Sequence, residues 1–389
     1  MIKLCETEQC TGCGACVNIC PEDCIEMISS DEGFDQPIID YEKCISCKSC
    51  QKVCPVLNPI STDNTVSPKI YAAWNLDDKI RTTSTSGGMF SAIANYVIEK
   101  GGYVYGAVFD NDWNVYHKGV STKEDIISMR GSKYVQSETG LIFREIQKKL
   151  DNENLILFSG TPCQIAGLYN FLGEKYSNLL ITVDFVCHGV PSPKLFQIYL
   201  KKLKKIYPDF EAINFRNPVK WEPQPLIKYR GKWQPIIRSA NTYFKLFFVN
   251  FTLRESCYRC LYAQFPRISD LTIADFWGIG KNIPFEQDTS KGVNLLMVNS
   301  DKGERVMNSI KNNCFLEERT MKEASYKNRQ LLSPAKRPLN RDSVYKDFES
   351  LSMDKMEEKY LFPTYPLKVV ILKKLRQKLI DILKLDKIK

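Results

Sequence analysis

The sequence predicts a small α+β module at the N-terminus, then a larger α/β domain and a helical C-terminal tail. Two cysteine-rich runs with the same spacing mark the module within residues 1–58. Farther along, buried strands lead through tight turns directly into helices, which is typical of a parallel α/β unit. The last segment repeats apolar residues at helical spacing among many lysines. A chain of 389 residues is long enough for two or three such domains.

Composition is that of a globular protein whose cysteines bind metal. Hydrophobic residues make up 43% of the chain, which suffices for a large core and excludes a disordered chain. The N-terminus lacks the apolar stretch of a signal peptide, and no run of about 18 apolar residues predicts a membrane span. We therefore expect a cytoplasmic protein whose fifteen cysteines are metal ligands and not disulfides. The charge of +9 comes without a basic stripe or a known motif, so we expect no nucleic acid partner.

The two cysteine runs share the spacing C-x2-C-x2-C-x3-C-P, the ligand pattern of a bacterial two-cluster ferredoxin. In that pattern, three cysteines of one run and the fourth of the other hold each cluster. The spacing thus assigns one 4Fe-4S cluster to Cys10, Cys13, Cys16 and Cys54, and a second to Cys44, Cys47, Cys50 and Cys20. We expect each fourth cysteine at or near the start of a short helix. The alternative, structural zinc, needs four ligands per site in a looser layout.

Beyond the module, strands and helices alternate along the chain. Residues 59–69 are rich in Ser, Thr, Asn and Pro and predict a linker. We expect strands at 69–76, 103–110, 155–159, 180–186, 268–278 and 293–300, with several short strands between 210 and 254. We expect helices after Gly88, over 138–150, from Pro162, over 195–207 and over 302–311.

A turn rich in hydroxyl groups precedes the helix after Gly88. It holds Ser84, Thr85, Ser86, Gly87 and Gly88. Free backbone N–H groups at a helix N-terminus suit a phosphate or pyrophosphate, but a simple N-cap explains the turn equally well. A second stretch, MRGSKYVQS, carries Ser132, Lys133 and Tyr134, and by itself indicates a solvated loop.

Several chemically capable side chains lie at predicted strand ends and turns. Cys163 falls in the first turn of a helix, where the dipole stabilises a thiolate. Cys187 and His188 follow a strand, and Asp275 ends another. Cys257 and Cys260 form a C-x-x-C pair, so these four cysteines make a plausible third quartet. We expect Cys5, Cys24 and Cys314 to be ordinary thiols. Arg216, Lys220 and Lys133 would either bind an anionic substrate or simply face water.

Four motifs together resemble the coenzyme F-420 hydrogenase/dehydrogenase beta-subunit family. They are TSTSGGMFSAIANYVIEKGG, MRGSKYVQS, the pair GTPCQIAGL and DFVCHGVPSP, and C-x-x-C followed by ADFWG. The resemblance covers about residues 70–330, with an N-terminal region at 70–155 and a C-terminal region at 156–334. Members are iron–sulfur flavoproteins. The resemblance therefore implies an α+β ferredoxin module fused to an α/β flavoprotein domain, with FAD and a third 4Fe-4S cluster on Cys163, Cys187, Cys257 and Cys260.

The resemblance also implies a function. Electrons would pass from a redox partner protein or ferredoxin through the clusters to FAD and a small-molecule substrate, which makes the chain a flavin-dependent oxidoreductase. The implied FAD or substrate contacts are Ser84, Thr85, Ser86, Gly87, Gly88, Ser132, Lys133 and Tyr134. His188 would tune the cluster or donate a proton, and Asp275 would orient the flavin or substrate, although structural roles are open for both. The alternative is a non-catalytic electron-transfer subunit that serves a separate oxidoreductase.

The tail, 335–389, differs from the rest. Residues 367–389 combine basic residues with apolar residues at helical spacing, which suits peripheral contact with the inner face of a membrane or packing against a protein. Some family members are linked to bacterial surface-polysaccharide synthesis. The fused ferredoxin module and the basic tail make this chain most similar to that group.

Overall fold

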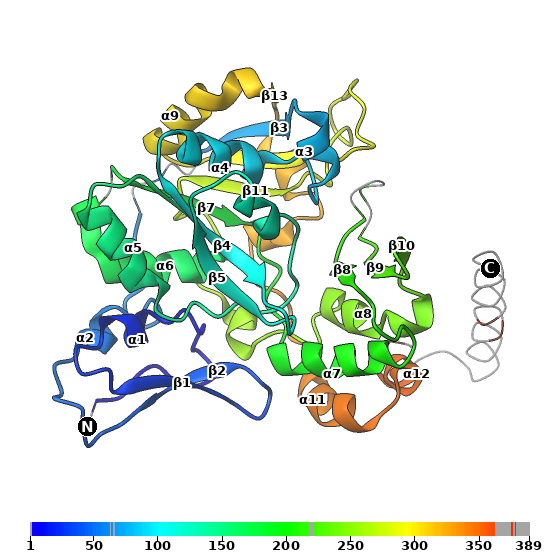
Figure 1. The fold of residues 1–389 in the computed structure, drawn as a ribbon, viewed down its shortest axis with the longest axis horizontal. Coiled ribbons are helices and arrows are strands. Elements are labelled where there is room, and N and C mark those ends of the chain that lie inside the picture. The colour runs from blue at the N-terminus through cyan, green and yellow to red at the C-terminus, as the bar shows by residue number, and fades with distance from the viewer. Residues whose placement is uncertain are drawn as a thin grey trace.

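The computed structural model has one central mixed sheet of eight strands with helices on both faces (Figure 1). It describes residues 2–62, 64, 67–176, 178–217, 221, 223–361, 375 and 378. The strand order is β13-β3-β12-β11-β7-β6-β4-β5. These strands are β3 (Lys69–Asn75), β4 (Tyr103–Phe109), β5 (Val115–Val120), β6 (Ile156–Gly160), β7 (Leu180–Phe185), β11 (Leu271–Asp275), β12 (Asn294–Val298) and β13 (Cys314–Glu318). Strands from both halves of the region that resembles the beta subunit therefore form one sheet.

The four central strands, β4, β6, β7 and β11, run parallel. The outer strands pair antiparallel with their neighbours, partly because a short turn joins β4 directly to β5. The predicted parallel unit is thus the centre of a mixed sheet. The carboxyl ends of β6, β7 and β11 meet at one edge, which is where ligands bind in open α/β sheets.

Alternating side chains of the central strands pack against helices on opposite faces. Val104 of β4 and Leu157 of β6 contact one group of helices, whereas Tyr105 and Phe158 contact the other. The first group contains α4 (Met89–Glu99) and α9 (Asp301–Ile310), and the second contains α5 (Ile142–Asp151) and α6 (Pro162–Leu172). Two short helices, α3 (Asp78–Thr82) and α10 (Met321–Ser325), lie outside these groups.

Local capping fixes the start of α6 where the sequence predicts it. Pro162 occupies the first helical position, and Thr161 and Gln164 form a capping box across the first turn. The Ser300 side chain caps α9 by accepting a hydrogen bond from the Gly303 amide. The predicted start of α6 is confirmed, and α9 begins at Asp301, one residue before its predicted start.

The N-terminal module lies against α5 and α6 (Figure 1). It contains α1 (Ala15–Ile19), a hairpin of β1 (Ile25–Ser29) and β2 (Asp35–Ile39), and α2 (Ser49–Lys52). The prediction that each fourth cysteine begins a helix is wrong, because Cys20 and Cys54 follow α1 and α2 instead. In each run, the helix carries the third cysteine and ends before the fourth.

A separate aromatic core lies beside the sheet. It joins α7 (Pro193–Lys204), α8 (Thr242–Phe248), α11 (Arg341–Ser350) and α12 (Met353–Met356) to a small sheet of β8 (Ala212–Asn214), β9 (Leu226–Tyr229) and β10 (Lys232–Pro235). The short strands expected between 210 and 254 are present as β8, β9 and β10. From Thr242 onward the chain forms α8 instead, where Tyr243, Phe244, Leu246 and Phe247 are buried. The helix predicted at 367–389 lies outside the described residues apart from Leu375 and Lys378. No described helix is both long and apolar enough to cross a membrane.

Candidate iron–sulfur sites and the adjoining pocket

The eight cysteines of the module lie in two groups, which we call quartets I and II. In quartet I, burial raises the pKa of the Cys16 thiol, and the nearby sulfurs of Cys13, Cys10 and Cys54 raise it further. In quartet II, burial together with the sulfurs of Cys47, Cys20 and Cys44 raises the pKa of Cys50 in the same way. The structure thus brings together the same residues that the spacing assigns to each cluster.

Two further cysteines of the module lie directly beside these quartets. The Cys24 Sγ is 3.4 Å from the Cys20 Sγ. Cys5 hydrogen-bonds with Cys10 and Cys54, and these contacts raise its pKa far above the usual value. Both residues are therefore neighbours of the expected ligands, which their position in the sequence did not indicate. Cys314 is buried in the core of the sheet.

A third quartet forms at the edge of the sheet from three separate segments. Cys163 lies in the first turn of α6, Cys187 follows β7, and Cys257 and Cys260 lie in and just after a 3-10 helix, Glu255–Arg259. Burial raises the pKa of Cys187, and the neighbouring sulfurs of Cys257, Cys163 and Cys260 raise it further. We call this group quartet III. Burial also outweighs the helix terminus at Cys163 and raises the pKa of that thiol to about 11.

The surroundings of quartet III suit a 4Fe-4S cluster. Backbone N–H groups of Gly189, Val190 and Tyr262 donate to its sulfurs, and the Thr161 Oγ1 lies 3.1 Å from the Cys163 Sγ. Hydrogen bonds to sulfur are a usual feature of such sites. Among the described residues, no three His, Cys, Asp or Glu side chains lie close enough to hold one metal ion. A cubane cluster needs a wider arrangement, because each thiolate binds its own iron.

Quartets I and III are neighbours across the contact between α1 and α6. Gly167 of α6 packs so closely on Cys13 that an added Cβ would lie 2.9 Å from the Cys13 Sγ. Tyr262 bridges the same region, because its hydroxyl donates to the Pro55 carbonyl at 2.7 Å while its ring lies near Cys163 and Cys13. Only a small residue at position 167 allows this approach.

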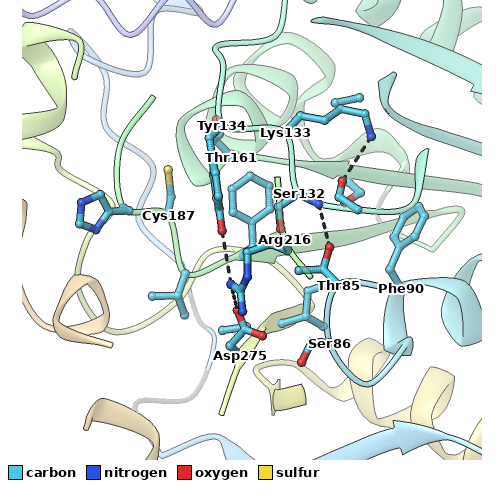
Figure 2. A pocket seen from close by; sticks show the side chains of 18 of the residues that line it. Thr85, Ser86, Phe90, Ser132, Lys133, Tyr134, Thr161, Cys187, Arg216 and Asp275 are labelled. Carbon is cyan, nitrogen blue, oxygen red and sulfur yellow. Dashed lines mark hydrogen bonds and ion pairs between the residues drawn. The ribbon is translucent and has the colours of Figure 1, made fainter. Parts of the chain in front are cut away.

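A pocket of about 780 Å³ adjoins quartet III, with Cys187 in its wall (Figure 2). This volume lies within the range of roughly 300–1,000 Å³ that is usual for ligand sites. Besides Cys187, the pocket brings together ten residues singled out from the sequence: Ser84, Thr85, Ser86, Gly88, Ser132, Lys133, Tyr134, His188, Arg216 and Asp275. Gly87 is not in the wall. It packs against β3, where a Cβ would lie 2.4 Å from the Ala73 carbonyl oxygen.

The hydroxyl-rich turn largely satisfies its own hydrogen bonds. Ser84 donates to the Ile80 carbonyl at 2.8 Å, and Ser86 donates to the Val293 carbonyl at 2.9 Å. The Met89 amide, at the start of α4, donates to the Asn294 side chain at 3.1 Å. These contacts favour a structural role for the turn over a phosphate site, the two alternatives that the sequence left open.

Thr85 ties the turn to the loop that follows Met129. Its Oγ1 accepts a hydrogen bond of 2.9 Å from the Ser132 amide (Figure 2). On the same loop, the Lys133 Nζ donates to the carbonyls of Met129, Arg130 and Gly131, at 3.2–3.4 Å. Burial lowers the pKa of Lys133 to about 8. Lys133 therefore organises the loop around its own ammonium group.

Arg216 and Asp275 form an ion pair in the wall of the pocket (Figure 2). The Arg216 Nη1 lies 2.6 Å from the Asp275 Oδ2 and 3.3 Å from the Tyr134 hydroxyl. Trp221 donates to the other carboxylate oxygen at 2.8 Å. The Arg216 guanidinium also lies 4.9 Å from the centre of the Trp277 ring. Asp275 thus orients Arg216. The sequence did not indicate this pair, because the two residues lie far apart in the chain. Lys220 lies outside the described residues.

His188 lies beside the aromatic end of α8. Its ring meets Phe247 edge-on, with the ring centres 5.0 Å apart. Burial lowers the pKa of His188, so the imidazole is neutral at pH 7. No described residue accepts or donates a hydrogen bond at its buried Nε2. The residue lies next to both the pocket and quartet III, and a proton-donating role for it stays a prediction.

Comparison with known proteins agrees with the motifs. The family model for the N-terminal part of the coenzyme F420 hydrogenase/dehydrogenase beta subunit matches residues 70–142, and that for its C terminus matches 153–324. A 4Fe-4S dicluster domain matches residues 9–58, which confirms the predicted iron–sulfur module.

Two individual proteins are also similar. An uncharacterized protein of Methanocaldococcus jannaschii is 23% identical over 338 residues, which cover 77% of this chain and 86% of that protein. A chain in the structure of the F420-reducing [NiFe] hydrogenase complex from Methanosarcina barkeri is 16% identical, with a TM-score of 0.46. That match covers 77% of this chain and 95% of the hydrogenase chain.

These matches correct one expectation. The two family models describe the beta subunit of a hydrogenase or dehydrogenase and not a complete enzyme, so the expectation of a FAD-dependent enzyme in its own right is wrong. An iron–sulfur electron-transfer subunit, the alternative interpretation of the sequence, fits these matches. The two models together span most of the chain behind the dicluster domain, and the chain therefore belongs to the coenzyme F420 hydrogenase/dehydrogenase beta-subunit family.

Proposed function

We propose that this chain is a non-catalytic electron-transfer subunit that carries single electrons through three 4Fe-4S clusters for a separate oxidoreductase. The observation that carries the proposal is the position of quartet III. Cys163 lies in the first turn of α6, the helix whose Gly167 packs on Cys13 of quartet I, and Cys187 lines the pocket. Quartet III thus lies between the N-terminal module and the pocket. A relay of one-electron carriers needs such a continuous sequence of sites.

Quartet II is the side on which a redox partner docks. Cys47 is exposed, whereas the ligands of quartet I are buried or half-buried. Ile45, an exposed apolar side chain, lies in the same loop beside Cys47. Electrons enter or leave at the ligand closest to solvent. The order of sites is then quartet II, quartet I, quartet III and the pocket.

The pocket holds FAD as the last carrier of this relay. Support comes from its volume, from the aromatic rings of Tyr134 and Trp277, and from the Arg216 cation in its wall. A flavin accepts electrons singly and can release them in pairs, which suits the end of a one-electron relay. The surface-polysaccharide setting expected from the resemblance and the membrane contact expected from the basic tail have no supporting contact among the described residues and are not part of the proposal.

Anaerobic purification with iron, sulfide and flavin quantified together tests the proposal. We expect about twelve irons per chain, as three 4Fe-4S clusters require, and one FAD. Eight irons without flavin would support the two clusters of the N-terminal module but contradict a third cluster that connects them to the pocket. The isolated chain should reduce artificial one-electron acceptors but turn over no substrate until its partner is added. Substrate turnover by the chain alone would contradict a non-catalytic subunit.

A further inference from the structure

Arg254 is a fully buried arginine that joins the N-terminal module to the edge of the sheet. Its relative exposure is 2%. The Nε donates to the Cys10 carbonyl at 2.7 Å, and the Nη2 donates to the Asp35 carbonyl at 2.8 Å. The Nη1 donates to the Gln136 side-chain oxygen at 3.0 Å. All three acceptors are neutral oxygens, so these bonds fix the guanidinium without balancing its charge.

The other two fully buried arginines have carboxylate partners. Arg267 pairs with Asp184 at 2.6 Å, and Arg341 pairs with Glu32. Arg254 makes no ion pair with any described carboxylate. Although Asp35 is close, burial raises the pKa of its carboxyl group, and only its backbone oxygen contacts the guanidinium. A buried charge without a counter-charge is strongly destabilising, so the sequence retains Arg254 for an anion that the protein chain does not supply.

Arg254 joins the ligand segments of two quartets. Its guanidinium donates to the backbone of Cys10 in quartet I. Its own backbone lies among the segments of quartet III, because its amide donates to the Val190 carbonyl at 3.0 Å and its carbonyl accepts from the Cys257 amide at 2.9 Å. The residue therefore lies between the two expected clusters. A cluster bound by four thiolates carries negative charge, which increases by one on reduction. Such a cluster would supply the negative charge that Arg254 lacks among the described residues.

The loop of quartet I is shaped around this arginine. Gly12 has a positive φ of 67°, and a Cβ there would lie 2.7 Å from the Arg254 Nη1. Gln136 holds both partners, because it accepts from Arg254 while its Nε2 donates to the Thr11 carbonyl at 3.0 Å. Gly12 thus makes room for a cation in the loop that carries Cys10 and Cys13.

We propose that Arg254 is the shared counter-charge of the clusters in quartets I and III, and that it raises the reduction potentials of both. This inference rests on the proposed relay. When one electron leaves quartet I and enters quartet III, no bond or proton changes, and the total charge around Arg254 stays the same. A cation between the two sites therefore favours reduction of either cluster. It changes the free energy of electron transfer from one cluster to the other very little. Quartet II lies beyond its reach.

A redox titration of the purified holoprotein, followed by electron paramagnetic resonance, tests this assignment. In Arg254→Gln, we expect the equilibrium constant for reduction to fall at least tenfold at two of three clusters, which corresponds to about 59 mV for one electron. The third cluster should stay unchanged. Arg254→Lys keeps the charge and should stay within about threefold of wild type.

Arg144→Gln is the matched control. Arg144 also holds the module through backbone carbonyls, those of Asn18 and Cys20, but it has a carboxylate partner, Asp23. Its removal should not shift the two clusters that respond to Arg254→Gln. A similar shift in both variants would show that loosening of the module is the cause, and would overturn the inference.

The remaining outcomes are also decisive. Full iron content in Arg254→Gln with three unchanged potentials would overturn the role of the charge. If Arg254→Gln loses iron, Arg254→Lys decides, because retained clusters support a counter-charge and lost clusters show a purely steric requirement. Wild-type protein without iron would instead defeat the proposed relay itself, a failure that iron analysis distinguishes from a failure at Arg254.

Discussion

Quartets I and II and quartet III meet the same chemical demand with different amounts of structure. The first two need one stretch of chain, in which two short helices, α1 and α2, and a hairpin suffice to bring eight thiols into two groups. Quartet III needs a strand end, a helix start and a 3-10 turn that the chain supplies from distant segments. The difference teaches that a compact module can be added to the chain as a unit, whereas quartet III and its pocket depend on the whole sheet.

The largest effect that would sharpen this comparison is the loss of one cluster alone. Cys187→Ala should lower the iron content from about twelve to about eight atoms per chain, because it breaks quartet III and leaves the local runs intact. Cys314→Ala is the matched control, since Cys314 is a buried cysteine in the core of the sheet and belongs to no quartet. Iron and sulfide analysis after anaerobic purification measures both. Loss of all the iron in Cys187→Ala would show that the module cannot hold its clusters independently.

The same comparison explains what the sequence could predict. The ligands of quartets I and II follow from spacing, because neighbouring residues fix the loop. Helix starts such as Pro162 and Ser300 follow from capping chemistry within one turn. The contact of Gly167 with Cys13, the pairing of Arg216 with Asp275 and the place of Arg254 do not follow, because each joins segments that only the folded sheet brings together.

The next effect concerns the pocket. Asp275→Asn should lower the free energy of unfolding by about 3 kcal/mol, because it leaves the Arg216 cation buried with a neutral partner. It should also weaken FAD retention, since Arg216 loses its orientation. Asp78→Asn removes a solvent-exposed pair with Lys291 and should cost much less stability, because water screens the two charges.

Denaturant unfolding and flavin release measure these two variants. Equal stability losses in them would show that the Arg216–Asp275 pair is no more important than an exposed one. That result would remove the contrast between a pocket built by tertiary contacts and the solvent-exposed surface.

The boundary between the two regions gives a smaller effect. Gly167→Val should destabilise the protein by about 1–3 kcal/mol, because the added side chain presses on Cys13. It should also slow the passage of electrons from quartet I to quartet III, as followed by rapid mixing with dithionite and optical detection. Gly101→Ala is the control, since its φ of 73° strains the alanine backbone while its methyl group would meet no atom within 4 Å, so this variant should lose stability without any change in the rate. An unchanged rate in Gly167→Val would place the relay elsewhere.

The smallest effect is a pH dependence that belongs to the sheet region alone. Burial lowers the pKa of Lys133 from 10.5 to about 8 in the folded chain. Between these two values the unfolded chain binds a proton that the folded chain has released, so the contribution of Lys133 to stability rises with pH. Unfolding free energies of wild type and Lys133→Met at pH 7 and pH 10 should therefore diverge in favour of wild type at the higher pH. A constant difference would mean that the ammonium group, held by three carbonyls, keeps its proton, and that the loop beside the pocket is stabilised by a permanent charge.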